Sequence, residues 1–487
     1  MRKPYDKQRR FDCTPIGELT LNFECRDETI PVLAGLKHIY TSQVLRQKLV
    51  KLVADDLNED SRRDVGRPGL DDWQVVVLAA VRLGCNYDYD KLQDQCENHR
   101  VLRTLLGIGA WDDHLSFGAR RVRDTLCQLS PQTIAAINHA IVSYGQELDG
   151  GASKSVRADS FVVETNVHYP TESSLIGDGI RKLIPLCVDL SNEIGASGWR
   201  QSDHLLKRIK DQVRQISRIC ASKSPKAKAR VAPAYGRLLT RAATILDRAE
   251  MLVQQATTED SSLTAILMSS QLTHWIQLTR QVCDTAHRRV LLGEQVPNCE
   301  KLFSLFETHT QLYRRGKAGH PQQFGRLVLV YEDGAGFISH YHLMDRDASD
   351  ADVVVEQTRE AQRKHRGQIE TASFDRGFYS ADNERLLAEI VADTCLPPRH
   401  PQQYAETLKS GSVTFHQLRQ RHPGIESAIG ALQSGNGLER CRDRSEIGFE
   451  RYLGLAILGR NIHTLGKLLI ARQAAQSTAA HTQRKAG

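Results

Sequence analysis

The sequence of 487 residues lacks long apolar runs and lacks a strong excess of either charge. No apolar stretch approaches the roughly 20 residues that a bilayer-spanning helix needs. The basic start of the chain is not followed by the apolar segment of a signal peptide. These absences argue against a membrane protein and against secretion, so we expect a soluble cytoplasmic protein.

The cysteines also lack the arrangement of a disulfide framework. There are eleven of them, spread from Cys13 to Cys441, and none belongs to a CxxC pair. An odd, scattered set predicts reduced thiols. Cys96 and His99 have the spacing of half a zinc site, but no second half follows, so we interpret both as structural residues.

The composition that remains is globular. Hydrophobic residues make up 40% of the chain and charged residues 25%, which excludes wholesale disorder. At roughly 150 residues per domain, the length predicts about three folding units.

The formal net charge of +7 is concentrated in one segment. Residues 200–248 contain thirteen Lys and Arg and three acids, a net charge of +10, whereas the rest of the chain has 52 basic against 55 acidic residues. Such a block is the electrostatic footprint of phosphate binding. The modest total charge therefore does not argue against a nucleic-acid partner.

Two stripes run along the helix predicted over 202–220. The apolar stripe consists of Leu206, Ile209, Val213, Ile216 and Cys220. The basic stripe consists of Lys207, Lys210, Arg214 and Arg218. After Pro233 the helical pattern resumes and is accompanied by Arg237 and Arg241. We expect these basic residues to follow DNA phosphates.

The pattern along the chain predicts an α/β protein with a helical N-terminal region and a basic helical insertion. A strand pair is expected within residues 16–33, followed by helices that include 89–106, 117–129 and 131–144. The helix over 117–129 carries Arg120 and Arg121, for which simple helix packing and DNA contact are equally good interpretations. We predict these regions: a helical DNA-binding or oligomerisation region (1–150), the first part of the catalytic core (151–190), the insertion (191–316), the rest of the core (317–472) and a flexible tail (473–487).

Three acidic residues stand out by their placement. Asp159 lies inside a strand predicted over 156–164, where an unpaired charge is costly to bury. Asp375 ends the strand predicted over 369–374, and Glu426 lies early in a helix that begins near Pro423. Taken singly, Asp375 has the alternative role of ending a strand and Glu426 that of a favourable acid at a helix start.

Together the three carboxylates suit a metal site. Carboxylates at one sheet edge repel one another unless cations lie between them, and oxygen ligands of this kind favour Mg²⁺ or Mn²⁺. Two such ions about 4 Å apart activate the attacking oxygen and stabilise the leaving oxygen in phosphodiester cleavage.

Three ordered blocks of the sequence resemble those of bacterial insertion-sequence DDE transposases. They are Asp159-Ser160-x-Val162-Val163-Glu164-Thr165-Asn166-x-His168-Tyr169-Pro170-Thr171, then Asp375-Arg376-Gly377-Phe378-Tyr379-Ser380, then Ile425-Glu426-Ser427 leading to Gly437-Leu438-x-Arg440-Cys441-x-Asp443. Gly66-Arg67-Pro68-Gly69 and Leu105-Leu106-Gly107-Ile108 also resemble the N-terminal half of these proteins. Within this family the chain is similar to the unclassified group, ISNCY.

The resemblance implies an RNase H-like mixed sheet, interrupted by the helical insertion, with Asp159, Asp375 and Glu426 as catalytic metal ligands. It implies double-stranded DNA as the partner, both the terminal inverted repeats of an element and the target, and at least a homodimer to hold two DNA ends. The expected place of action is the bacterial nucleoid.

The chain departs from the family in one place. Many relatives have Tyr and Arg before the Glu and a Lys or Arg seven residues after it, whereas His422 and Gln433 occupy the nearest positions here. Arg419 and Arg421 are possible substitutes, and a solvated helix end explains them equally well. Arg376 pairs either with Asp375 or with DNA.

Three polar residues near Asp159 have alternative roles. We favour structural roles over metal-site support for Glu164 and Asn166. For His168 a backbone hydrogen bond is commoner than a phosphate contact.

The leading hypothesis is a transposase that hydrolyses a phosphodiester at the ends of an insertion sequence and joins the 3′-hydroxyl to target DNA. One alternative is a non-catalytic, domesticated or decayed DNA-binding protein. Another is a nuclease that cuts without strand transfer.

Overall fold

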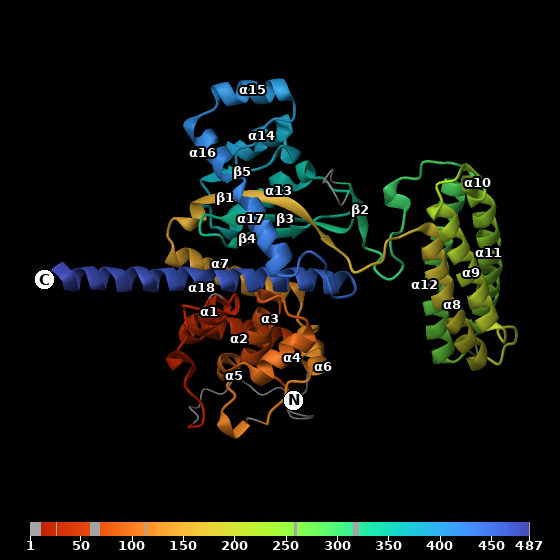
Figure 1. The fold of residues 1–487 in the computed structure, drawn as a ribbon, viewed down its shortest axis with the longest axis horizontal. Coiled ribbons are helices and arrows are strands. Elements are labelled where there is room, and N and C mark those ends of the chain that lie inside the picture. The colour runs from red at the N-terminus through yellow and green to blue at the C-terminus, as the bar shows by residue number, and fades with distance from the viewer. Residues whose placement is uncertain are drawn as a thin grey trace. The chain divides into compact units, whose positions relative to one another are not determined.

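The computed structural model describes residues 11–25, 27–58, 69–112, 114–257, 261–314 and 321–486, with side chains described only up to residue 476 in the last range. The Gly66-Arg67-Pro68 block therefore lies outside the described residues. The chain divides into two compact units (Figure 1). Unit 1 comprises residues 1–164 and 326–487, and unit 2 comprises residues 165–325.

A mixed sheet has most of its strands in unit 1, whereas β2 and the first three residues of β3 belong to unit 2. Its strands are β1 (Ser155–Glu164), β2 (Gln311–Tyr313), β3 (Gln323–Asp333), β4 (Ile338–Leu343), β5 (Thr371–Ser373) and β6 (Asp393–Cys395). The strand order is β2-β3-β1-β5-β6, and β4 also pairs with β3. Strand β5 runs parallel to both β1 and β6, whereas β4 runs antiparallel to β3. The α/β, RNase H-like fold is thereby confirmed.

Strands β3 and β4 form a hairpin. Its turn is closed by Asp333, whose carboxylate accepts the N–H groups of Ala335 and Phe337, each at 3.0 Å. Gly336 adopts a φ of +87°, a backbone conformation that favours glycine.

The N-terminal part of unit 1 is helical. The helices are α1 (Thr29–Thr41), α2 (Gln43–Asn58), α3 (Asp72–Gly84), α4 (Tyr89–Asn98), α5 (Arg100–Leu105), α6 (Ala119–Leu126) and α7 (Pro131–Leu148). The long C-terminal helix α18 (Glu446–Ala486) packs against α1, α3 and α7 (Figure 1). Gly459 permits this approach, because a Cβ atom there would lie 2.3 Å from the backbone nitrogen of Gly84.

Two predictions about this part are wrong. The strand pair within residues 16–33 is absent, since a 3₁₀ turn occupies Ile16–Glu18 and helix α1 begins at Thr29. Val32, Leu33 and Leu36 are buried at helical spacing, so packing against α18 overrides the local β preference. The helix predicted over 89–106 is broken at His99, whose imidazole Nδ1 accepts the N–H of Leu102 and starts α5.

Shorter helices accompany the second half of the sheet. They are α13 (Asp350–Lys364), α14 (Ala381–Ala388), α15 (Pro401–Ser410), α16 (Val413–Arg421) and α17 (Gly424–Gly430), the last followed by a π-helical turn, η7 (Ala431–Gly435). Residues 473–486, predicted as a flexible tail, continue helix α18. Unit 1 joins the N-terminal helices to the sheet around one hydrophobic core, and the predicted division at residue 150 stays a prediction.

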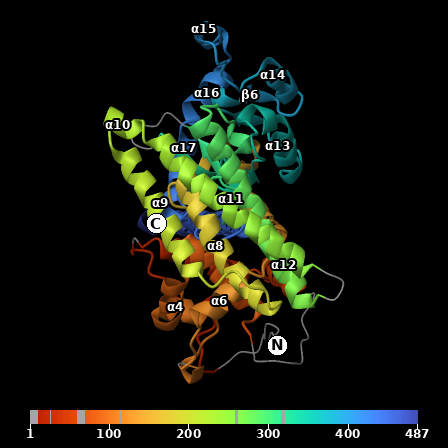
Figure 2. The same cartoon turned by 90° about the vertical axis from the view of Figure 1, so that its right-hand side faces the viewer.

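Unit 2 is a helical bundle with its own core. Helices α8 (Glu172–Glu193), α9 (Ser202–Ala221), α11 (Val231–Ala256) and α12 (Leu263–Ala286) run side by side, and α10 (Pro225–Lys228) joins two of them (Figure 2). The compact unit starts at Thr165 and ends at Gly325, whereas the predicted insertion covers 191–316. The unit starts earlier because Ile176, Ile180 and Leu183 bury α8 in the bundle.

Candidate active site

Asp159 lies in the middle of β1, and Asp375 lies two residues past the end of the neighbouring strand β5. The parallel ladder between β1 and β5 ends at the pair Arg157 and Ser373, and each aspartate follows two residues after one member of this pair. Adjacent strands lie about 4.8 Å apart. The half-buried Asp159 accepts the N–H of Ser160 at 2.7 Å, and Asp375 is exposed at the start of the turn Arg376–Phe378. The fold therefore lets the chain leave β5 at Asp375 beside the part of β1 that carries Asp159.

Glu426 lies in the first turn of α17 and is exposed. Side chains alternate along a strand, so Asp159 shares a face of β1 with Phe161 and Val163. These two residues lie in the same hydrophobic core as Ile425 and the rest of the apolar face of α17, which contacts β1. Helix α17 therefore covers the face of the sheet toward which Asp159 projects.

Arg157 fixes the start of α17 to β1. Its Nε donates to the Glu332 carboxylate of β3 at 2.6 Å, and its Nη1 donates to the carbonyl of Arg421 at 3.1 Å. Gly424 makes room for this side chain, because a Cβ atom there would lie 2.1 Å from Arg157 Nη1. The start of the segment that carries Glu426 is thus bonded to Arg157, which lies two residues before Asp159 on β1.

The segment after η7 is also tied to β1. The backbone of Glu164 exchanges hydrogen bonds with Glu439 and Cys441, and the Arg440 guanidinium donates to the Glu164 carboxylate at 3.0 Å. This supports the structural role predicted for Glu164. With both ends fixed, the segment carrying Glu426 is held along the strand that carries Asp159.

His422 lies between these elements. It is buried, and its Nδ1 lies 3.1 Å from the hydroxyl of Ser373, two residues before Asp375. Burial lowers the pKa of His422 to about 4, although the nearby charge of Asp375 acts in the opposite direction. His422 therefore stays neutral at physiological pH, unlike the basic residues at this position in the resembled family.

The donor chemistry of the three carboxylates fits a hard divalent cation, since all offer oxygen atoms. Among the described residues, no three His, Cys, Asp or Glu side chains form a ready-made metal-binding group. The backbone placement brings the elements of all three acids together, but the side chains do not converge on one point. Like charges repel each other, which favours such a separated arrangement.

The basic stripe predicted on α9 is present. Lys207, Lys210, Arg214 and Arg218 are all exposed, and none has an ion-pair partner among the residues described. The apolar stripe is largely as predicted, except that Ile219 and not Cys220 is buried.

Two arginines of α9 line a hollow on the surface of unit 2. The cavity has a volume of about 470 Å³, and Arg214, Arg218 and Arg230 contribute three positive charges to it, with Asp211 as the acid. On α11, Arg237 is exposed and Arg241 half-buried. This face of the bundle presents positive charge that the bundle itself does not neutralise.

The remaining predicted DNA contacts have varied surroundings. Arg120 is exposed and lies 3.7 Å from Asp124, an arrangement that needs no DNA. Arg121 is also exposed on α6. Arg376 stacks on the ring of Tyr404, 4.1 Å from its centre.

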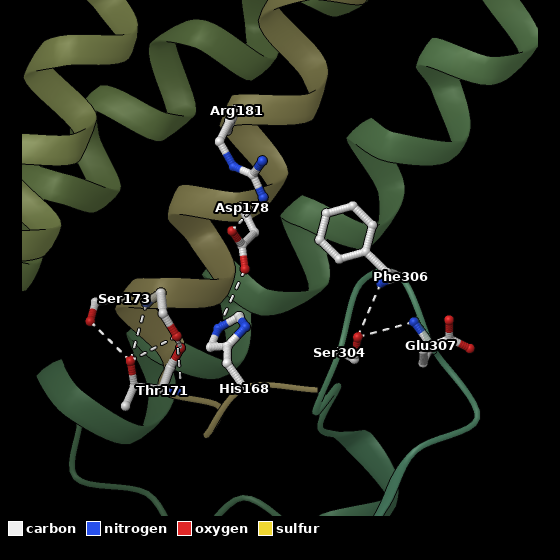
Figure 3. Close-up of polar contacts among 9 residues, drawn as sticks. His168, Thr171, Ser173, Asp178, Arg181, Ser304, Phe306 and Glu307 are labelled. Carbon is white, nitrogen blue, oxygen red and sulfur yellow. Dashed lines mark hydrogen bonds and ion pairs between the residues drawn. The ribbon is translucent and has the colours of Figure 1, made fainter. Parts of the chain in front are cut away.

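His168 is engaged within unit 2. Figure 3 shows its ring directed at Asp178 of α8, with Nε2 at 3.5 Å from the carboxylate, and the same carboxylate receives Arg181 at 3.0 Å. The contact differs from both roles considered for His168, because its partner is a side-chain carboxylate. Asn166 is exposed.

The sequence interpretation missed Arg157, Glu332 and Tyr404. A signal existed for Arg157, because it precedes Asp159 by two residues and so shares its face of the strand. Glu332 ends a strand of apolar residues, where a buried acid calls for a basic partner. No local signal identifies Tyr404, since its contacts come from distant parts of the sequence.

The structure also bears on the other sequence predictions. All eleven cysteines are free, with Cys96 buried in the core of unit 1, as expected for a structural residue. Within the described residues, no helix is long and apolar enough to cross a membrane.

Comparison with known proteins finds a family match within the second half of the chain. Residues 301–462 match the family model described as the transposase DDE domain. Asp375 and Glu426 fall inside the match. Asp159 precedes it in the sequence, before the residues of the helical unit. No curated protein and no solved structure matches the chain. The assignment to the ISNCY group stays a prediction. Residues 301–462 therefore match a transposase DDE domain, and the resemblance of this chain to the DDE transposases is confirmed.

Proposed function

We propose that this protein is an active transposase in which Asp159, Asp375 and Glu426 hold the metal ions that cleave and join DNA. The observation that carries the proposal is that β5 ends beside the middle of β1, the strand against which α17 packs. A DDE transposase domain implies DNA as the partner, and such enzymes typically use a divalent metal.

The chain contributes positioning and charge to the reaction. Asp159 and Asp375 supply two carboxylates from adjacent strands, and Glu426 supplies the third from the helix above them. When bound, two Mg²⁺ or Mn²⁺ ions supply activation of the attacking oxygen and charge stabilisation of the leaving oxygen. Arg157 holds α17 against the sheet, which limits the movement of Glu426. The same site serves hydrolysis at the element end and the later attack of the 3′-hydroxyl on target DNA.

The unpaired basic face of unit 2 supports a role in holding DNA. Each phosphate that a Lys or Arg neutralises releases counterions, so the face adds affinity without sequence preference. The basic hollow between Arg218 and Arg230 has the charge to receive a backbone phosphate. Since two element ends must be joined to one target, we propose at least a homodimer in the DNA complex.

The test is a nicking assay on duplex DNA carrying the inverted repeats that flank the gene. Asp159→Asn, Asp375→Asn and Glu426→Gln should each abolish Mg²⁺-dependent nicking and leave DNA binding largely unchanged. The exposed acid Asp382 of α14 provides the control, since Asp382→Asn should cleave like wild type. Retained cleavage in a triad variant would remove that residue from the site.

The same assay separates the alternatives. A wild-type protein that binds the repeats but never nicks them is a non-catalytic DNA-binding protein. One that nicks but fails to join a pre-cut 3′ end to target DNA is a nuclease without strand transfer.

A further inference from the structure

Helix α16 brings basic residues to the Asp375 end of the sheet. Phe415 and Leu418 of this helix pack against Cys395 of β6. The next residue, Arg419, lies within electrostatic reach of Asp375: a hydrogen bond to Tyr404 is the main cause that raises the pKa of Arg419, and Asp375 adds to it. The packing of α16 therefore places the Arg419 guanidinium where the charge of Asp375 acts on it.

Tyr404 of α15 holds two arginines at once. The guanidinium of Arg376 stacks on its ring with a separation of 4.1 Å from the ring centre. The Nε of Arg419 donates to its hydroxyl at 3.2 Å. These contacts hold two guanidinium groups against the same tyrosine side chain, although their like charges repel each other.

Arg399 stabilises the turn from which Arg376 projects. Its Nε donates to the carbonyl of Arg376 at 3.2 Å, and its Nη2 donates to the carbonyl of Gly377. The turn directly follows Asp375, so the position of Arg376 is fixed relative to that carboxylate.

These arginines form no ion pair in the part of the chain that the structure describes, although the charge of Asp375 acts on Arg419 from a greater distance. Among the residues that the structure describes, Arg376, Arg399 and Arg419 have no ion-pair partner, whereas the nearby exposed Arg385 pairs with Glu389 at 3.1 Å. A guanidinium has the planar donor geometry that recognises phosphate. A phosphodiester between Arg376 and Arg419 would reduce the repulsion between the two guanidinium groups, and its oxygens would accept hydrogen bonds from them.

We infer that Arg376, Arg419 and Tyr404 form a phosphate clamp that binds a backbone phosphate of DNA next to the one cleaved at Asp375. Arg376 and Arg419 contact the phosphate, and Tyr404 is a positioning residue that keeps the two guanidinium groups together. This inference rests on the proposed function, since it assigns the position of the DNA strand at that site.

The clamp is tested by the salt dependence of binding. Fluorescence anisotropy with a blunt duplex of mixed sequence, in Ca²⁺ instead of Mg²⁺ and with a gel check that the DNA stays intact, gives affinity against salt concentration. Arg376→Gln and Arg419→Gln should each reduce the slope of log K against log salt by about 1, and the double variant by about 2. Arg385→Gln removes one charge from the same unit and should leave the slope unchanged. A double variant with the slope of Arg385→Gln would overturn the clamp.

Tyr404 variants test the positioning role separately. Tyr404→Phe keeps the ring beneath Arg376 and removes the bond to Arg419, whereas Tyr404→Leu removes both contacts. Binding should weaken in the order wild type, Phe, Leu, although no charge is lost, and circular dichroism checks that each variant is folded. Equal affinities in all three would remove Tyr404 from the clamp.

The outcomes distinguish this inference from the proposed function. A reduced slope in a protein that never nicks DNA would leave the clamp standing and refute the catalytic proposal. Normal nicking by the wild type, with an unchanged salt slope in the double variant, would refute the clamp and leave the catalytic proposal standing.

Discussion

Positive charge is held differently at Arg82 of unit 1 and on helix α9 of unit 2. In unit 1, Arg82 is buried, with 2% of its side chain exposed, and its guanidinium lies 2.5 Å from the Asp443 carboxylate. In unit 2, the four basic residues of the α9 stripe are exposed and without ion-pair partners among the described residues. An arginine that is buried with an acidic partner stabilises the fold, whereas an exposed arginine without an ion pair is available to a ligand.

Unit 2 also contains an arginine that pairs with acids, although 40% of its side chain is exposed. Arg280 of α12 bonds Asp247 and Glu250 of α11 at 2.8 and 2.6 Å. Its partners are supplied by the neighbouring helix, whereas α9 carries its excess charge on the face turned away from the core. The contrast makes α9 the part of unit 2 where substitution should change binding more than stability.

The largest expected effect on stability is at Arg82. Arg82→Met leaves the Asp443 charge nearly buried without its partner and should lower the free energy of unfolding by about 3–5 kcal/mol. Urea denaturation measures the loss. The double variant with Asp443→Leu should recover much of it, and a single variant as stable as wild type would refute the structural role of the pair.

Asp333 should make the stability of unit 1 depend on pH. Burial raises its pKa from 3.8 to about 7, opposed by hydrogen bonds that include one from Gln146. The native state therefore binds this proton more tightly than the unfolded state. Its contribution to stability is complete below pH 4 and is lost as the pH rises to about 7.

Asp333→Asn should remove that dependence. Relative to the variant, wild type should lose on the order of a few kcal/mol of unfolding free energy between pH 4 and 7. Denaturation at several pH values measures this difference, with the exposed Asp382→Asn as a control. Parallel pH profiles for wild type and Asp333→Asn would contradict the prediction.

Arg157 should affect both stability and catalysis. Arg157→Gln loses the bond to Glu332 and the contact with the Arg421 carbonyl, which should cost about 1–3 kcal/mol by urea denaturation. Nicking should fall as well, because α17 loses its attachment beside Asp159. Gly424→Ala displaces the same guanidinium and should act in the same direction; a variant with full activity would show that Glu426 is positioned without Arg157.

The smallest effect on stability is expected on α9. Replacing Lys207, Lys210, Arg214 and Arg218 together by Glu should change the unfolding free energy by less than about 0.5 kcal/mol per residue. The same change should weaken DNA binding and flatten its salt dependence. Arg280→Gln is the matched control, with little effect on DNA binding; an unchanged salt slope in the α9 variant would reassign the stripe to solubility.

The comparison also shows what the sequence could and could not reveal. The stripe on α9 was readable because a helix places residues three and four apart on one face whatever surrounds it. The sequence did not predict the group formed by Tyr404, Arg376 and Arg419, because its contacts depend on how α15, α16 and the turn after β5 pack. The same reason explains the strand pair wrongly predicted within residues 16–33, where α18 stabilises a helix.

Periodicity and local motifs are properties of neighbouring residues, so they were enough to predict most helices and strands, the basic face of α9 and the three acids of the proposed site. The folded chain was needed to show that β1 and β5 are adjacent, that Arg157 and Arg440 tie the Glu426 segment to β1, and that the helical unit begins at Thr165. These features depend on contacts between residues far apart in the chain, such as the 264 positions that separate Arg157 from Arg421.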